Sequence, residues 1–165
     1  MLLYSYKRKG EIKMTKQINL DCDGTFVDLY GVENWLFYLL NSDPTPYEIA
    51  KPLVNLSSLA KALNKLQRGG YKIVIISWLS KNATADYNIA VTKAKRTWLK
   101  KHLPSVKFDE IKIVPYGTPK SQCGEGYLWD DEQKNRTEWE NHGGKAFSAN
   151  TLVKDLWALS GAVTG

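Results

Sequence analysis

Residues 18–25 read Ile-Asn-Leu-Asp-Cys-Asp-Gly-Thr, a short apolar run that ends in two carboxylates and a glycine turn. Aspartate is a poor strand residue, so two of them at the end of a strand need a reason beyond local propensity. Because side chains alternate along a strand, Asp21 and Asp23 point to the same side. Two like charges held this close repel unless a cation or a shared proton offsets them. The stretch predicts a buried strand with a site for a hard cation such as Mg²⁺ at its end; an ordinary strand running into an Asp-Gly turn is the alternative.

Length and composition indicate one folded domain. The chain has 165 residues, of which 43% are hydrophobic, and this is enough to bury a core. No apolar run approaches the length of a membrane span. The first residues lack the order of a signal peptide, which favours a cytoplasmic location and no membrane partner. Cys22 and Cys123 are the two cysteines, and such a pair does not indicate a disulfide framework.

The positive charge is concentrated at the start of the chain. The formal net charge is +6, and residues 1–16 hold five basic side chains and one acidic one. The remainder of the chain is therefore close to neutral. We expect residues 1–16 to be a flexible basic extension and residues 17–160 to be a single folded domain.

Strand-like and helix-like segments alternate after residue 25. Strands are expected at residues 71–77, 111–114, 127–131 and 145–148, and helices at residues 32–40, 53–67, 83–103, 133–141 and 151–159. Prolines and turn residues at 41–46 are expected to end the helix at residues 32–40. This alternation predicts an α/β domain, a Rossmann-like three-layer sandwich around a mainly parallel five-stranded sheet with right-handed crossovers.

Polar side chains follow several of the predicted strands. In parallel sheets, ligands bind outside the carboxyl ends of the strands. We therefore expect a common site from the groups at these ends: Asp21, Asp23, Ser77, Asp130 and Asp131 at strand ends, and Lys120 in the loop after residues 111–114.

In this order the groups resemble the four motifs of the haloacid dehalogenase-like superfamily, over nearly the whole body of the chain. Residues 21–25, DCDGT, are similar to the first motif, and the strand ending at Ser77 to the second. Lys120 is the best match to the basic third motif, and Asp130-Asp131 to the acidic fourth. Each motif alone is weak, whereas all four in order are specific.

The resemblance implies a Mg²⁺-dependent phosphatase that acts through an aspartyl-phosphate. Asp21 would be the nucleophile, and Asp23 would protonate the leaving group and later activate water. The metal would be held by Asp21, by the main-chain carbonyl of Asp23 and by Asp131, with Asp130 in support. The alternative for the acidic pair is to cap the helix that follows.

The resemblance also implies a phosphate-binding set. Ser77, Lys120 and the amides following Asp21, those of Cys22 and Gly24, would contact phosphoryl oxygens. Each has an ordinary alternative: the Ser77 hydroxyl could bind backbone, Lys120 could be a solvated loop lysine, and the Cys22 side chain is expected to be a small buried filler rather than a nucleophile.

The substrate expected from this comparison is a small phosphate ester, in particular a nucleotide. Residues 127–144 are similar to the fourth-motif region of the 5'-deoxyribonucleotidase-like branch, which dephosphorylates nucleoside monophosphates. The chain lacks that branch's sizeable helical cap, and only residues 29–51 leave room for a small one. Such an open site admits bulky substrates, or takes its lid from another subunit of a homo-oligomer or from the substrate itself. Tyr30 and Trp78 are candidates to stack on a base.

Two other functions stay open at the level of sequence. A phosphatase for nucleic-acid ends fits the open site, the basic extension and the basic residues within 93–107, and predicts activity that weakens with salt. A non-catalytic protein that sequesters a nucleotide on the same scaffold is the second alternative, and the intact Asp21 and Asp23 argue against it.

Overall fold

The computed structural model describes residues 14–81 and 83–162. The basic extension predicted at residues 1–16 lies outside the described residues apart from residues 14–16. Among the helices of the described part, none is both long and apolar enough to cross a membrane.

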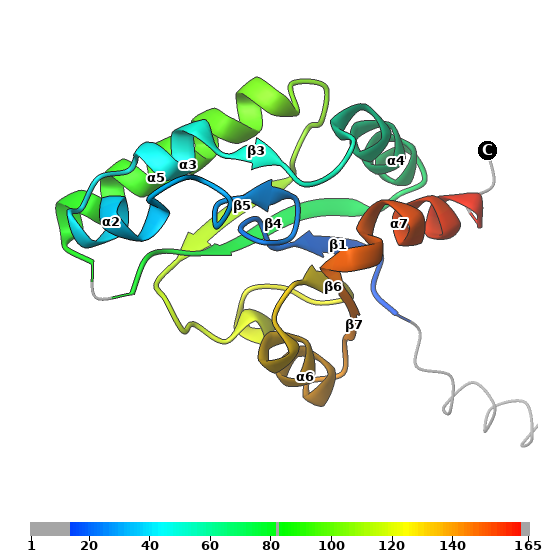
Figure 1. Ribbon diagram of the computed structural model, residues 1–165. Coiled ribbons are helices and arrows are strands. Elements are labelled where there is room, and N and C mark those ends of the chain that lie inside the picture. Colours follow the sequence, from blue (N-terminus) through cyan, green and yellow to red (C-terminus); the bar gives the residue numbers. More distant parts are fainter. Residues whose placement is uncertain (1–13, 82, 163–165) are drawn as a thin grey trace, which may run out of the picture.

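A five-stranded sheet forms the centre of the molecule (Figure 1). Its order is β5-β4-β1-β6-β7, and every neighbouring pair is parallel. The strands are β1 (Gln17–Leu20), β4 (Lys72–Trp78), β5 (Glu110–Val114), β6 (Tyr127–Asp130) and β7 (Lys145–Ser148). From the central β1 the chain builds outward through β4 and β5, and then crosses to build β6 and β7 on the other side. The strand order therefore reverses beside β1, where parallel sheets open a crevice for ligands.

Helices cover both faces of the sheet (Figure 1). One side carries α4 (Leu56–Arg68), α5 (Ala85–His102) and α7 (Leu152–Gly161), and the other carries α6 (Gln133–Asn141). Short 3₁₀ turns, η1 (Lys120–Gln122) and η2 (Ala149–Thr151), follow β5 and β7. The prediction of an α/β three-layer sandwich with a parallel five-stranded sheet is confirmed.

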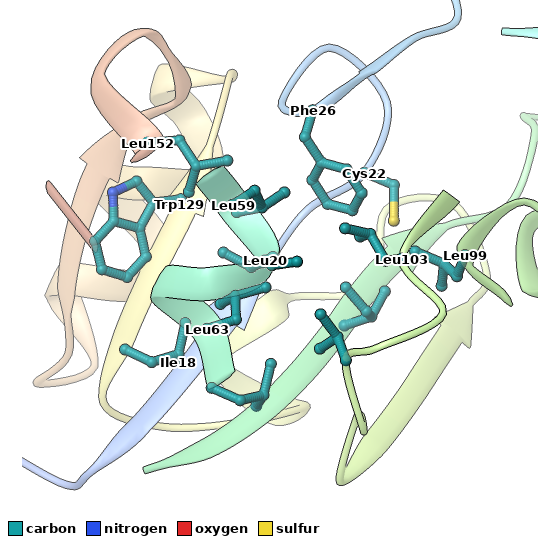
Figure 2. Packing of buried hydrophobic residues seen from close by; sticks show 14 of the residues in the cluster. Ile18, Leu20, Cys22, Phe26, Leu59, Leu63, Leu99, Leu103, Trp129 and Leu152 are labelled. Atoms are coloured by element: carbon teal, nitrogen blue, oxygen red, sulfur yellow. The ribbon is translucent and has the colours of Figure 1, made fainter. Parts of the chain in front are cut away.

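The main core lies between the sheet and the helices α4, α5 and α7 (Figure 2). Apolar side chains alternate along the strands, so one face of β1 presents Ile18 and Leu20 to this core. They meet Leu59 and Leu63 of α4, Leu99 of α5 and Leu152 of α7. A second, smaller cluster on the opposite face joins Val74, Ile76 and Leu128 to Trp139 of α6. Burial of β4 on both faces explains its unbroken run of β-branched residues.

Residues 26–55 hold small elements between β1 and α4. Strands β2 (Val27–Asp28) and β3 (Lys51–Pro52) form a short antiparallel pair. Helix α2 (Trp35–Leu40) begins later than the predicted residue 32, because Asn34 adopts a left-handed φ of 61°. The predicted break at residues 41–46 is found, because α2 ends at Leu40. The short helix α3 (Thr45–Ile49), which begins within this stretch, was not predicted; Pro46 lies in its first turn, where the missing N–H is harmless.

Candidate active site

A tight turn after β1 presents the first acidic pair. The Asp21 amide still donates to the Trp129 carbonyl (3.0 Å), so the backbone stays beside β6 to this point. The Cys22 carbonyl then accepts from the amides of Thr25, Phe26 and Val27 (3.0–3.1 Å), which folds the chain back. Within this turn the Thr25 hydroxyl donates to Asp21 Oδ2 (2.9 Å) and fixes one side of the carboxylate.

Lys120 joins the acidic tips of β1 and β6. Its Nζ lies 2.7 Å from Asp21 Oδ1 and 2.7 Å from Asp130 Oδ2, and the side chain is buried. Burial alone would lower the pKa of Lys120, but Asp21 and Asp130 outweigh it and raise this pKa above its ordinary value. Asp130 is held further by the Glu132 amide (2.8 Å) and by Asn135 Nδ2 (3.1 Å). The lysine therefore carries its charge at neutral pH, between two fixed carboxylates.

Three carboxylates gather at this point. Asp21, Asp130 and Asp131 each offer an oxygen, and these oxygens lie within 4.8 Å of one another. Removal from water and the nearby Asp21 raise the pKa of Asp131 to about 8. Gly24 permits this approach, since its φ is +79° and a Cβ atom there would overlap the Asp131 carboxylate. Such crowding of negative charge is relieved by a cation.

Asp23 is paired with a second buried lysine, Lys95 of α5. Lys95 Nζ lies 2.8 Å from Asp23 Oδ2 and donates to Ser77 Oγ (2.6 Å) and to the Trp78 carbonyl (2.7 Å). Burial raises the pKa of Asp23, and the Lys95 ammonium opposes this shift without cancelling it.

The sequence-based set of site residues did not include Lys95. The signal was nevertheless present: Lys95 lies four residues after Val91 and four before Leu99, on the apolar face of the predicted helix. A lysine at such a position is buried, and a buried lysine requires a partner.

These groups surround a cavity of about 220 Å³ at the carboxyl edge of the sheet. Its polar wall consists mainly of Asp21, Asp23, Lys120, Asp130 and Asp131, and its aromatic wall of Tyr30, Trp35, Tyr47, Trp78 and Tyr116. The aromatic side chains form two pairs: Trp78 with Tyr116, whose ring centroids are 5.0 Å apart, and Tyr30 with Trp35, at 5.1 Å. The Trp78 indole is fixed by a hydrogen bond from Nε1 to the Thr118 carbonyl (2.8 Å).

Three residues expected to bind phosphate do not line the cavity. Ser77 is completely buried beneath the cavity wall, and its hydroxyl oxygen accepts from Lys95. The Cys22 side chain is buried, and burial raises the pKa of its thiol to about 12, as suits a filler. The prediction for Gly24 needs correction, because its amide donates to the Val27 carbonyl (2.8 Å) to close the turn and is not free for phosphate.

A larger cavity of about 600 Å³ lies at the opposite edge of the sheet, near the amino ends of β1 and β6. Its wall includes Gln17, Lys112, Gly124 and Trp139. None of the candidate catalytic, metal-binding or phosphate-binding residues lines it, so its size does not make it the reactive site.

The fold and the position of the cavity define a Rossmann-like α/β protein with an acidic, lysine-bridged site at the switch point of its sheet. The crystal structure of D,D-heptose 1,7-bisphosphate phosphatase from Burkholderia thailandensis has a similar fold, with a TM-score of 0.54 and 12% sequence identity over 88% of this chain and 98% of that one. At this identity the likeness concerns the fold alone. A HAD family enzyme from Bacteroides thetaiotaomicron has a TM-score of 0.47 and 12% identity, over 82% of this chain and 94% of that one. No protein-family model and no curated protein matches the sequence.

Proposed function

We propose that this chain is a haloacid dehalogenase-like phosphatase, a Mg²⁺-dependent hydrolase of phosphate monoesters that acts through an aspartyl-phosphate. The observation that carries the proposal is the gathering of Asp21, Asp130 and Asp131 oxygens within 4.8 Å, with Lys120 bridging two of them. These groups come from three separate segments of the chain, as the four-motif resemblance implies.

The charges of the site suit one divalent cation. Four carboxylates, those of Asp21, Asp23, Asp130 and Asp131, face two buried ammonium groups, those of Lys95 and Lys120. If all are ionised, two negative charges remain. The donors are carboxylate oxygens, which Mg²⁺ prefers, and Asp21 and Asp131 would hold the ion together with the Asp23 main-chain carbonyl. A bound Mg²⁺ would neutralise charge on the phosphoryl oxygens and let a carboxylate approach.

Each side chain of the site has its own role in the proposed reaction. Lys120 and Thr25 each hold one oxygen of Asp21, which orients this carboxylate for attack on phosphorus. As the bond from Asp21 to phosphorus forms, the bond to the leaving oxygen breaks and Asp23 donates a proton to that oxygen. Asp23 then takes a proton from water, and the water oxygen displaces Asp21 and releases phosphate.

The aromatic wall supports a nucleotide as the substrate. The rings of Tyr30 and Trp78 line the same cavity as the acidic side chains, and a planar base can stack on them there. Tyr30, Trp35 and Tyr47 come from residues 29–51, which we propose to act as a small cap over the cavity. A nucleoside 5'-monophosphate would place its phosphate at Asp21 and its base between the aromatic pairs.

The test of this function is phosphate release from a panel of nucleoside monophosphates, sugar phosphates, aryl phosphates and 5'-phosphorylated oligonucleotides. We expect release from nucleotides with Mg²⁺ and at least about a 100-fold loss with a chelator, because the metal stabilises transition-state charge by several kcal/mol. Preference for oligonucleotides, with rates that fall steeply with salt, would favour action on nucleic-acid ends instead. No release from any member of the panel would refute the proposal.

Gly24→Ala is expected to weaken the metal site. The new methyl group would displace the Asp131 carboxylate, and disturbing a ligand's position typically costs about 10–100-fold in metal affinity. Calorimetric titration with Mg²⁺ measures this change.

Gly70→Ala is the matched control for that substitution. Gly70 has a similar φ of +95°, but nothing lies within 4 Å of a Cβ atom placed there. Both variants carry backbone strain of about 1–2 kcal/mol, and only Gly24→Ala should lose Mg²⁺ affinity. Equal affinities in the two variants would show that Asp131 does not hold the ion.

A further inference from the structure

Lys95 is a buried lysine whose hydrogen-bonding capacity is fully used. Its side chain is 4% exposed, and its ammonium group has three acceptors: Asp23 Oδ2, Ser77 Oγ and the Trp78 carbonyl, at 2.6–2.8 Å. A lysine ammonium has three N–H donors and no acceptor. Each donor therefore has one partner, and the hydrogen-bond roles are unambiguous.

Packing alone does not account for a lysine at this position. Position 95 lies on the apolar face of α5, where a methionine or leucine would pack without the cost of removing an ammonium group from water. Buried ion pairs are often no more stabilising than apolar side chains of similar volume. The position therefore points to a role at the neighbouring site.

The geometry lets Lys95 act only through its partners. Asp23 lines the cavity, whereas Lys95 and Ser77 lie behind the wall. Pairing between β1 and β4 ends at Leu20 and Ile75, so beyond that point Lys95 ties Asp23 to the end of β4. It holds one oxygen of Asp23, Oδ2, and leaves Oδ1 for proton transfer. Behind the wall, Ser77 Oγ and the Trp78 carbonyl accept from Lys95 and hold its ammonium group in place.

We propose that Lys95 is a positioning residue that orients the Asp23 carboxylate for the reaction; this inference rests on the proposed phosphatase function. In the first step the Asp21–phosphorus bond forms, the bond to the leaving oxygen breaks, and the proton on Asp23 Oδ1 moves to that oxygen. In the second, Asp23 Oδ1 takes a proton from water, whose oxygen bonds to phosphorus as the Asp21–phosphorus bond breaks. Lys95 keeps its three protons throughout.

The dependence on the leaving group distinguishes this role from a purely structural one. The 5'-oxygen of a nucleoside monophosphate needs a proton as it leaves, whereas nitrophenolate leaves without one. In Lys95→Met we expect kcat/KM to fall about 100-fold for the nucleoside monophosphate and less than about 10-fold for nitrophenyl phosphate. Lys93→Met, a change at an exposed lysine of the same helix, is the control and should alter neither value.

A second background tests whether Lys95 acts through Asp23. Asp23→Asn already removes the proton donor, so adding Lys95→Met should leave kcat/KM unchanged within about twofold. The double variant also leaves no unpaired buried charge, so it can be measured even if Lys95→Met does not fold. Lys95→Gln, which keeps a donor for Asp23, is expected to recover part of the loss.

Two results would overturn the inference while the proposed function stands: equal losses for both substrates in Lys95→Met, or a further large loss in the Asp23→Asn background. Absence of turnover in the unaltered protein would instead refute the phosphatase function itself, and the positioning role with it.

Discussion

Asp21→Asn is expected to reduce phosphate release by on the order of 10⁴-fold or more, since losing a nucleophile removes the whole covalent route. Asparagine has nearly the same shape: with its oxygen at the Oδ1 position it still accepts from Lys120, and its NH2 group can then donate to the Thr25 hydroxyl oxygen. The loss should therefore appear in kcat far more than in the folding of the domain. Steady-state rates on the best nucleotide of the panel measure it.

Mass spectrometry gives an independent readout of the same prediction. Acid-quenched wild-type protein should carry one additional phosphoryl group on the peptide that contains residues 18–25, and Asp21→Asn should carry none. Asp86→Asn, at an exposed position in the first turn of α5, is the control and should keep the wild-type rate. Wild-type turnover by Asp21→Asn would place the nucleophile elsewhere.

Lys120→Met is expected to have the largest effect on stability. It leaves Asp21 and Asp130 facing each other without the ammonium that lies 2.7 Å from both. Removing one partner of a buried ion pair typically costs about 3–5 kcal/mol, and Lys120 is 2% exposed. For a domain of this size we expect a fall in Tm of roughly 10 °C, measured by thermal unfolding without divalent metal.

Lys134→Met is the matched control for that loss. Lys134 is another lysine near the acidic pair in sequence, but its side chain is exposed, so a change of less than about 0.5 kcal/mol is expected. Addition of Mg²⁺ should restore part of the stability of Lys120→Met, because a cation offsets the same carboxylates. A Tm equal to that of the wild type would show that the carboxylates stay protonated and need no ammonium partner.

Local patterns were sufficient for most of the secondary structure. The helix at Gln133–Asn141 and the strand at Lys145–Ser148 have the predicted bounds, and the other regular elements of the sandwich differ by a few residues at their ends. The prolines of residues 41–46 correctly indicated the end of the helix before them, but they concealed the helix at Thr45–Ile49, because a proline in the first turn of a helix gives up no hydrogen bond. Such a short helix is stabilised by packing, here of Tyr47 among side chains of α5, which no local pattern contains.

The sequence by itself determined which strands end in acidic or hydroxyl side chains, because strand periodicity and turn residues are local properties of the chain. Only the tertiary structure decided which of those groups reach the cavity. Lys95 pairs with Asp23 across 72 residues and Lys120 with Asp21 across 99, and each pair forms because two elements pack side by side. Ser77 lies behind the wall, where its hydroxyl oxygen accepts from Lys95 of α5. These charges are removed from water only when the layers of the sandwich assemble. A charge removed from water requires a partner, so the pairing also depends on this assembly.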